Sequence, residues 1–207
     1  MRNNFFKKNT HIVVSKKNNF IKYDINTVFG FLIYLMSDCI LFSVFFSVYF
    51  VLSSNSDFTI FNCHVINIYY VFIETIILLC SSFFYSISMV LLNNKENFYF
   101  YVYIFLTFIL GFFFILMELY ELVNFSRTNY FLVKNGIISS FFSLLILHAI
   151  HIFFGLIWII FMIVRVFTSK INKKIYTQFC CLGLFWHFLD IIWIFIFNFI
   201  YLFGLIK

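Results

Sequence analysis

The chain has 207 residues, of which 64% are hydrophobic and 11% charged, with a formal net charge of +6 at pH 7. Soluble proteins contain about 45–50% apolar and about 25% charged residues. A chain of this size has too much surface to hide so large an apolar excess inside a globule. The composition therefore indicates an integral membrane protein and excludes a cytosolic enzyme, a disordered chain and a nucleic-acid-binding module.

Five apolar runs are long enough to cross about 30 Å of hydrocarbon, which takes roughly 20 helical residues. They are too uniformly apolar for β-barrel strands, which alternate over about ten residues. The runs cover residues 29–52, 66–92, 98–122, 137–164 and 176–206. The sequence thus predicts an all-α integral membrane protein, in which a polar, basic tail (1–27) precedes a domain (28–207) that is a bundle of five transmembrane helices.

The basic residues orient the predicted bundle, because loops on the cytoplasmic side carry an excess of Lys and Arg. With a cytoplasmic N-terminus, the inner segments hold six basic residues in the tail, Lys95, and four more at Arg165, Lys170, Lys173 and Lys174. The outer segments hold three, Arg127, Lys134 and Lys207. This split predicts a cytoplasmic N-terminus and a periplasmic C-terminus, with anionic lipid headgroups as partners of the basic side.

Ionisable side chains inside the predicted spans are costly in lipid and by default suggest a function. Several stand three residues apart, which places both members of a pair on one helix face. One interpretation is that they bond one another and fix the helix register. The other is a lipid-headgroup or proton-linked role, chiefly for Asp38 and for Glu118 with Glu121. The candidate residues are Asp38, Glu74, Glu118, Glu121, His148, His151, His187 and Asp190.

The motifs of known active centres do not occur in this set. Di-metal sites in helix bundles use Glu-x-x-His on two helices and two further Glu, whereas the pairs here are Glu-x-x-Glu, His-x-x-His and His-x-x-Asp. A haem needs only one imidazole, so His148, His151 or His187 remains possible by residue type alone. Trp186 is a further candidate among these intramembrane polar residues, and we expect it to act by packing rather than by binding a cofactor. We predict no catalytic, cofactor-binding or metal-binding residue on this chain.

Five segments resemble, in family order, the helices of subunit III of the haem–copper terminal oxidases. The last of them contains Trp-His-Phe-Leu-Asp, which is similar to the family's Trp-His-Phe-x-Asp signature. The matching segments are Phe31–Ser43, Glu74–Ser82, Met117–Glu121, His148–Trp158 and Phe185–Trp193. The chain has no room for the two extra N-terminal helices usual in cytochrome c oxidase subunit III. Together with Ser37-Asp38, this resembles the subunit III of cytochrome bo-type ubiquinol oxidases.

The resemblance implies a complex that passes quinol electrons to O2 and pumps protons, with the haems and copper on subunit I. This chain would bind no redox cofactor, pack laterally on subunit I and on other oxidase subunits, and hold phospholipid. Its share would be structural support and assembly, in the bacterial inner membrane, with no nucleic-acid partner.

Three alternatives remain open. The first is subunit III of a cytochrome c oxidase. The second is a proton-coupled transporter, which would use Asp38, Glu74 and the His residues as a proton relay. The third is a membrane di-metal oxidase, which would require bound iron in the purified chain.

Overall fold

The computed structural model describes residues 24–54, 68–93, 97–128, 136–168 and 172–202. These residues form five α-helices and a short π-helix that continues the last of them. Each α-helix is long and apolar enough to cross a membrane, which confirms the predicted all-helical architecture with five spans. The elements are α2 (Ile25–Ser54), α3 (Ile68–Asn93), α4 (Asn97–Thr128), α5 (Gly136–Thr168), α6 (Lys173–Ile196) and η2 (Phe197–Leu202).

Several helices extend beyond the predicted apolar runs. The helix α2 begins at Ile25 rather than at residue 29, and α4 continues to Thr128 rather than ending at residue 122. A run of apolar residues marks only the hydrocarbon core, whereas the backbone can stay helical through the polar headgroup layer, which brings a bilayer to about 40–45 Å. The predicted tail, 1–27, lies outside the described residues except for its last four. The orientation of the termini stays a prediction.

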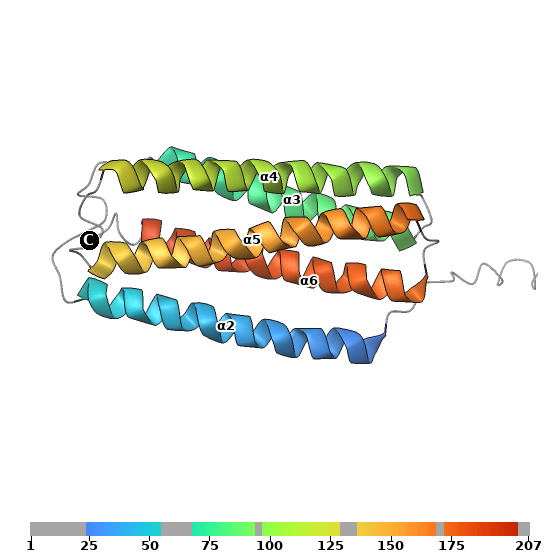
Figure 1. The fold of residues 1–207 in the computed structure, drawn as a ribbon, viewed down its shortest axis with the longest axis horizontal. Coiled ribbons are helices and arrows are strands. Elements are labelled where there is room, and N and C mark those ends of the chain that lie inside the picture. The colour runs from blue at the N-terminus through green and yellow to red at the C-terminus, as the bar shows by residue number, and fades with distance from the viewer. Residues whose placement is uncertain (1–23, 55–67, 94–96, 129–135, 169–171, 203–207) are drawn as a thin grey trace, which may run out of the picture.

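The helices lie side by side in three layers (Figure 1). The helices α3 and α4 form one layer, α5 and α6 the middle layer, and α2 the third. Contacts agree with this order, since α3 packs on α4 and α6, α4 packs on α5, and α2 packs on α5 and α6. Large apolar side chains remain exposed on the outer faces, for example Phe98, Phe161 and Ile191. This is the distribution expected of a bundle solvated by lipid.

The side chain of Trp186 on α6 fills the centre of the bundle. Its indole Nε1–H donates to Ser81 Oγ on α3 over 3.0 Å, and Trp186 is 1% exposed. A Cβ atom at Gly111 on α4 would stand 2.8 Å from Trp186 Cη2, and one at Gly155 on α5 would stand 3.1 Å from Cζ3. The two glycines therefore make room for the indole, which contacts three other helices at once.

A second close approach joins α6 to α3. The ring of Tyr85 lies against Gly183, where a Cβ atom would stand 2.7 Å from Tyr85 Cε1. The Tyr85 hydroxyl donates to the carbonyl oxygen of Phe179 over 2.7 Å. A glycine in a lipid-embedded helix lets a neighbouring element approach closely, and here it admits an aromatic ring rather than a second backbone.

Candidate functional site

The most deeply buried polar pair joins α4 to α5. His148 Nδ1 lies 3.5 Å from Glu118 Oε1, and both side chains are 0% exposed. His148 Nε2 lies 3.3 Å from the carbonyl oxygen of Leu189 on α6. The imidazole is stacked on the indole of Trp193, with ring centroids 5.1 Å apart. A carbonyl oxygen can only accept a hydrogen bond, so Nε2 of His148 carries a proton and donates it to Leu189 O. Nδ1 is then the ring atom that faces the carboxyl group of Glu118.

Two further carboxyl groups lie near Glu118. Glu121, one turn later on α4, accepts a hydrogen bond of 3.2 Å from the hydroxyl of Tyr201 in η2. Glu74 on α3 is 0% exposed, and within the described ranges neither of its carboxyl oxygens has a hydrogen-bond partner. Glu74 interacts electrostatically with both Glu121 and Glu118. We call Glu74, Glu118 and Glu121 the carboxyl cluster.

The pair on α6 has a different environment. His187 Nδ1 lies 3.8 Å from Asp190 Oδ2, and the side chain of His187 is 46% exposed while that of Asp190 is buried. His187 Nε2 also lies 3.2 Å from Ser86 Oγ on α3. The pair thus connects α6 with α3, but the imidazole stands at the surface of the bundle instead of in its interior.

Asp38 and His151 lie on the α2 side of the bundle. Asp38 is buried and interacts electrostatically with Tyr34 one turn earlier. Its Oδ2 has no hydrogen-bond partner in the part of the chain that the structure describes. His151 Nδ1 lies 2.7 Å from the carbonyl oxygen of Leu147 on its own helix. The His151 ring packs on Phe42 of α2 with centroids 5.1 Å apart.

The predicted site residues therefore fall into separate groups and do not form one centre. Glu74, Glu118, Glu121 and His148 come together. Asp190 on α6 pairs with the exposed His187 and also interacts electrostatically with His148, whereas Asp38 and His151 lie toward α2. Within the described residues, no group of three or more His, Cys, Asp or Glu is arranged to hold a metal ion.

Sequence reasoning missed the neutral partners of these groups. Tyr201, Ser86, Ser81 and the backbone carbonyl of Leu189 each contact a predicted site residue. No pattern in the sequence marks them, because a hydroxyl in an apolar helix usually bonds its own backbone, as Ser88 does with the carbonyl of Tyr85. Their roles depend on which helices are neighbours.

Comparison with known proteins decides the family. The profile of the family described as cytochrome c oxidase subunit III matches residues 9–205 of this chain. The chain belongs to that family. This confirms the resemblance drawn from the motifs and makes the chain a subunit III of a haem–copper oxidase, a multi-pass membrane protein whose partners are other oxidase subunits.

Relatives within this family have two kinds of name. The chain is 43% identical to a cytochrome bo(3) ubiquinol oxidase subunit 3 of Buchnera aphidicola subsp. Baizongia pistaciae, over 89% of this chain and 98% of that protein. It is 36% identical to the subunit of the same name from Pseudomonas aeruginosa, over 86% of each. It is 32% identical to a cytochrome c oxidase subunit 3 of Alkalihalophilus pseudofirmus, over 86% of this chain and 87% of that protein.

Proposed function

We propose that this chain is the non-catalytic subunit III of a proton-pumping respiratory oxidase that passes electrons from ubiquinol to O2. The observation that supports it is the identity of 43% with a ubiquinol oxidase subunit 3 over nearly the whole of both chains. The haems and copper are expected on subunit I of this complex. The work of subunit III is to support the assembly of subunit I, to keep it stable and to hold lipid against it.

A tagged copy of this chain, purified in mild detergent from cells of its own kind, tests the proposal. We expect subunit I and the other oxidase subunits to co-purify, and the preparation to oxidise ubiquinol. A complex assembled without this chain should keep its haem spectrum and lose activity faster during turnover. Haem bound to the isolated chain would contradict the non-catalytic role.

The alternative is subunit III of a cytochrome c oxidase, which the relative at 32% identity supports. The same preparation separates the two proposals, because only one electron donor should sustain O2 consumption. Turnover with reduced cytochrome c and not with ubiquinol would favour the alternative.

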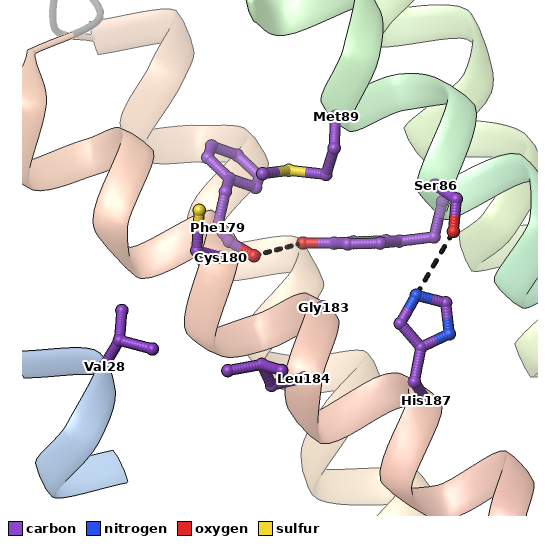
Figure 2. A pocket seen from close by; sticks show the side chains of 9 residues that line it. Val28, Ser86, Met89, Phe179, Cys180, Gly183, Leu184 and His187 are labelled. Atoms are coloured by element: carbon purple, nitrogen blue, oxygen red, sulfur yellow. Dashed lines mark hydrogen bonds between the residues drawn. The ribbon is translucent and has the colours of Figure 1, made fainter. Parts of the chain in front are cut away.

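A groove on the bundle surface supports the lipid-binding part of the proposal. It has a volume of about 390 Å³ and lies between α2, α3 and α6. Figure 2 shows Val28 at one end of it and Ser86 facing His187 at the other. Its lining is mainly apolar, with Met89, Phe179 and Leu184 among the side chains. A phospholipid acyl chain fits this chemistry.

The basic end of α6 supplies a place for the phosphate of such a lipid. Lys173 stands two helical turns before Cys180, which lines the groove, and so lies on the same face of α6. The side chain of Lys173 is 56% exposed and pairs with Asp24 at the start of α2. An anionic phosphate can share this ammonium group, since the amide groups of the first turn of α6 also favour negative charge.

Filling the groove tests the lipid proposal. Leu184→Trp should displace the acyl chain and reduce the phospholipid that stays on the purified complex in native mass spectrometry. Ile191→Trp is the matched control, because Ile191 is 52% exposed on the same helix and is not part of the lining. Equal lipid retention by both variants would contradict a site in this groove.

Orientation in the bacterial inner membrane is a further part of the proposal, supported by the charge split. A reporter fused after Lys207 should behave as periplasmic, and one inserted between Ser169 and Lys174 as cytoplasmic. The opposite pattern would overturn the proposed orientation.

A further inference from the structure

The carboxyl cluster lies deep at the end of the bundle where α4 ends and α3 begins. Glu74 is six residues from the start of α3, about 9 Å along the helix, and Glu118 is ten residues from the end of α4, about 15 Å. Both side chains are 0% exposed, and none of their four carboxyl oxygens has a hydrogen-bond partner among the described residues. Isolated ionised carboxylates at such a depth would be costly, by several kcal/mol each even after relaxation of the surroundings.

Within the part of the chain that the structure describes, few cationic groups are available to compensate these carboxyls. Among the described residues, His148 is the one group that could be cationic and stands within ion-pair distance of them. Arg165 bonds Gln178 and Lys173 pairs with Asp24, at the opposite end of the bundle. The described side chains also offer no ligand set for a metal ion. Among the groups that the structure describes, protons are therefore the cations that can compensate this cluster.

The hydrogen bonding of His148 fixes where one of these protons lies. Nε2–H is committed to the carbonyl of Leu189, so Nδ1 of a neutral ring would face Glu118 with a lone pair. A lone pair opposite an ionised carboxylate, 3.5 Å away, is repulsive. Either Nδ1 or the Glu118 carboxyl must carry a proton, and that proton lies between the two groups in both cases.

We propose that the carboxyl cluster and His148 form a site that binds exchangeable protons. One proton is held between Glu118 and His148, and a second makes Glu74 a neutral carboxylic acid. Glu74 has no cationic neighbour among the described residues and interacts electrostatically with two other carboxyls. Binding of a proton to Glu74 is therefore the least costly way to neutralise it. This inference goes beyond the supporting function proposed above and does not depend on it.

Every element around the cluster contributes a titratable group. Glu74 and Tyr70 come from α3, Glu118 and Glu121 from α4, His148 from α5, Asp190 from α6 and Tyr201 from η2. Glu121 is only partly buried and is hydrogen-bonded to Tyr201. Glu121 is thus the least buried member of the cluster, and in this proposal it passes protons to and from the two fully buried carboxyls.

Infrared spectroscopy of the purified oxidase tests the proposal, since a protonated carboxyl absorbs apart from a carboxylate and shifts in D2O. At neutral pH, Glu74→Gln should remove the absorbance of one protonated carboxyl per complex. Glu118→Gln should remove a second protonated-carboxyl band if Glu118 carries the shared proton, or an imidazolium band if His148 carries it. Glu121→Gln should slow the exchange of the remaining bands in D2O. Asp24→Asn is the control, because Asp24 is 41% exposed, paired with Lys173, and should leave the protonated-carboxyl region unchanged.

The outcomes separate this proposal from the supporting function. An unchanged protonated-carboxyl region in Glu74→Gln would show that Glu74 is ionised. A spectrum of Glu118→Gln in which neither the protonated-carboxyl bands nor the imidazolium bands change would show that no proton lies between Glu118 and His148. Either result would overturn the proposal. Failure of Glu74→Gln to assemble would also count against it, because the amide has the shape and charge of the neutral acid. Neither result would bear on co-purification with subunit I or on the choice of electron donor.

Discussion

The helices α6 and α2 are both long and apolar, yet they occupy opposite positions in the bundle. In the most apolar segment of α6, 61% of the residues are buried, against 17% in α2. Mean hydropathy does not separate them, at 2.0 for the segment in α6 and 2.1 for that in α2. Lipid is as apolar as a protein interior, so hydrophobicity alone does not decide which helix is central.

Small residues and side chains with a polar tip distinguish the central helix. On α6, Gly183 leaves room for the ring of Tyr85, and the indole N–H of Trp186 donates to Ser81 Oγ on α3. The contacts of α2 include the packing of Phe42 on His151. Just before its first residue, Asp24 pairs with Lys173 and donates its backbone N–H to Thr177 Oγ1 on α6. Close packing and interhelical hydrogen bonds are the forces that order helices in lipid, and α6 has more of both.

The largest expected difference is between two histidines of α5 that stand one turn apart. His148 faces α6 and His151 faces α2. His148→Ala leaves Glu118 buried without its partner and opens a void beside Trp193. We expect the free energy that stabilises the folded subunit to fall by about 3–5 kcal/mol, the usual cost of removing one partner of a buried pair. Thermal dissociation of the subunit from the purified complex measures it.

His151→Ala is the matched control for this prediction. His151 faces α2, and its ring contacts Phe42 while its Nδ1 bonds the carbonyl of its own helix. Losing one aromatic contact should cost about 0.5–1.5 kcal/mol. An equal loss of stability in the two variants would mean that the contacts of α5 with α2 stabilise the bundle as much as its contacts with α6.

A pair of glycines gives the next largest difference. Gly183→Ala places a Cβ atom 2.7 Å from Tyr85 Cε1, which should displace the ring and weaken its bond to Phe179. Overpacking of this kind costs about 1–3 kcal/mol. Gly30→Ala on α2 meets nothing within 4 Å and should stabilise the helix by up to about 1 kcal/mol. Urea or detergent denaturation should show a lower free energy of unfolding for Gly183→Ala and a higher one for Gly30→Ala. A lower value for Gly30→Ala would contradict the open space beside Gly30 on α2.

The contrast between α6 and α2 also marks what the sequence could predict. Five spans follow from composition and run length, and the polar candidates follow from the cost of charge in lipid. The pairing of Glu118 with His148 and of Glu121 with Tyr201 required the helix order, which hydropathy does not contain. The exposure of His187 could not be predicted either. Its position one residue after the buried Trp186 fixes the direction of its side chain, but not whether another helix covers that side of α6.

A smaller effect is expected at Asp190. Asp190→Ala removes the neighbour of His187, but the imidazole keeps its contact with Ser86 and its exposed surface. We expect the free energy of unfolding to fall by up to about 2 kcal/mol, the upper range for an interhelical hydrogen bond in a membrane. The amount of assembled complex on a native gel should fall more than the turnover per complex. Normal assembly with lost turnover would instead indicate a proton-transfer role for this pair.

The smallest effect is expected on the outer face of α2. Ser37, Ser43 and Ser47 are exposed there, and each hydroxyl donates to a carbonyl of its own helix three or four residues earlier. Replacing all three by Ala removes no bond to another helix, so the free energy of unfolding should change by no more than about 0.5 kcal/mol. Thermal dissociation and native gels of the triple variant measure this. A clear loss of assembled complex would show that another subunit covers this face and that α2, peripheral within this chain, is an interior helix of the oxidase.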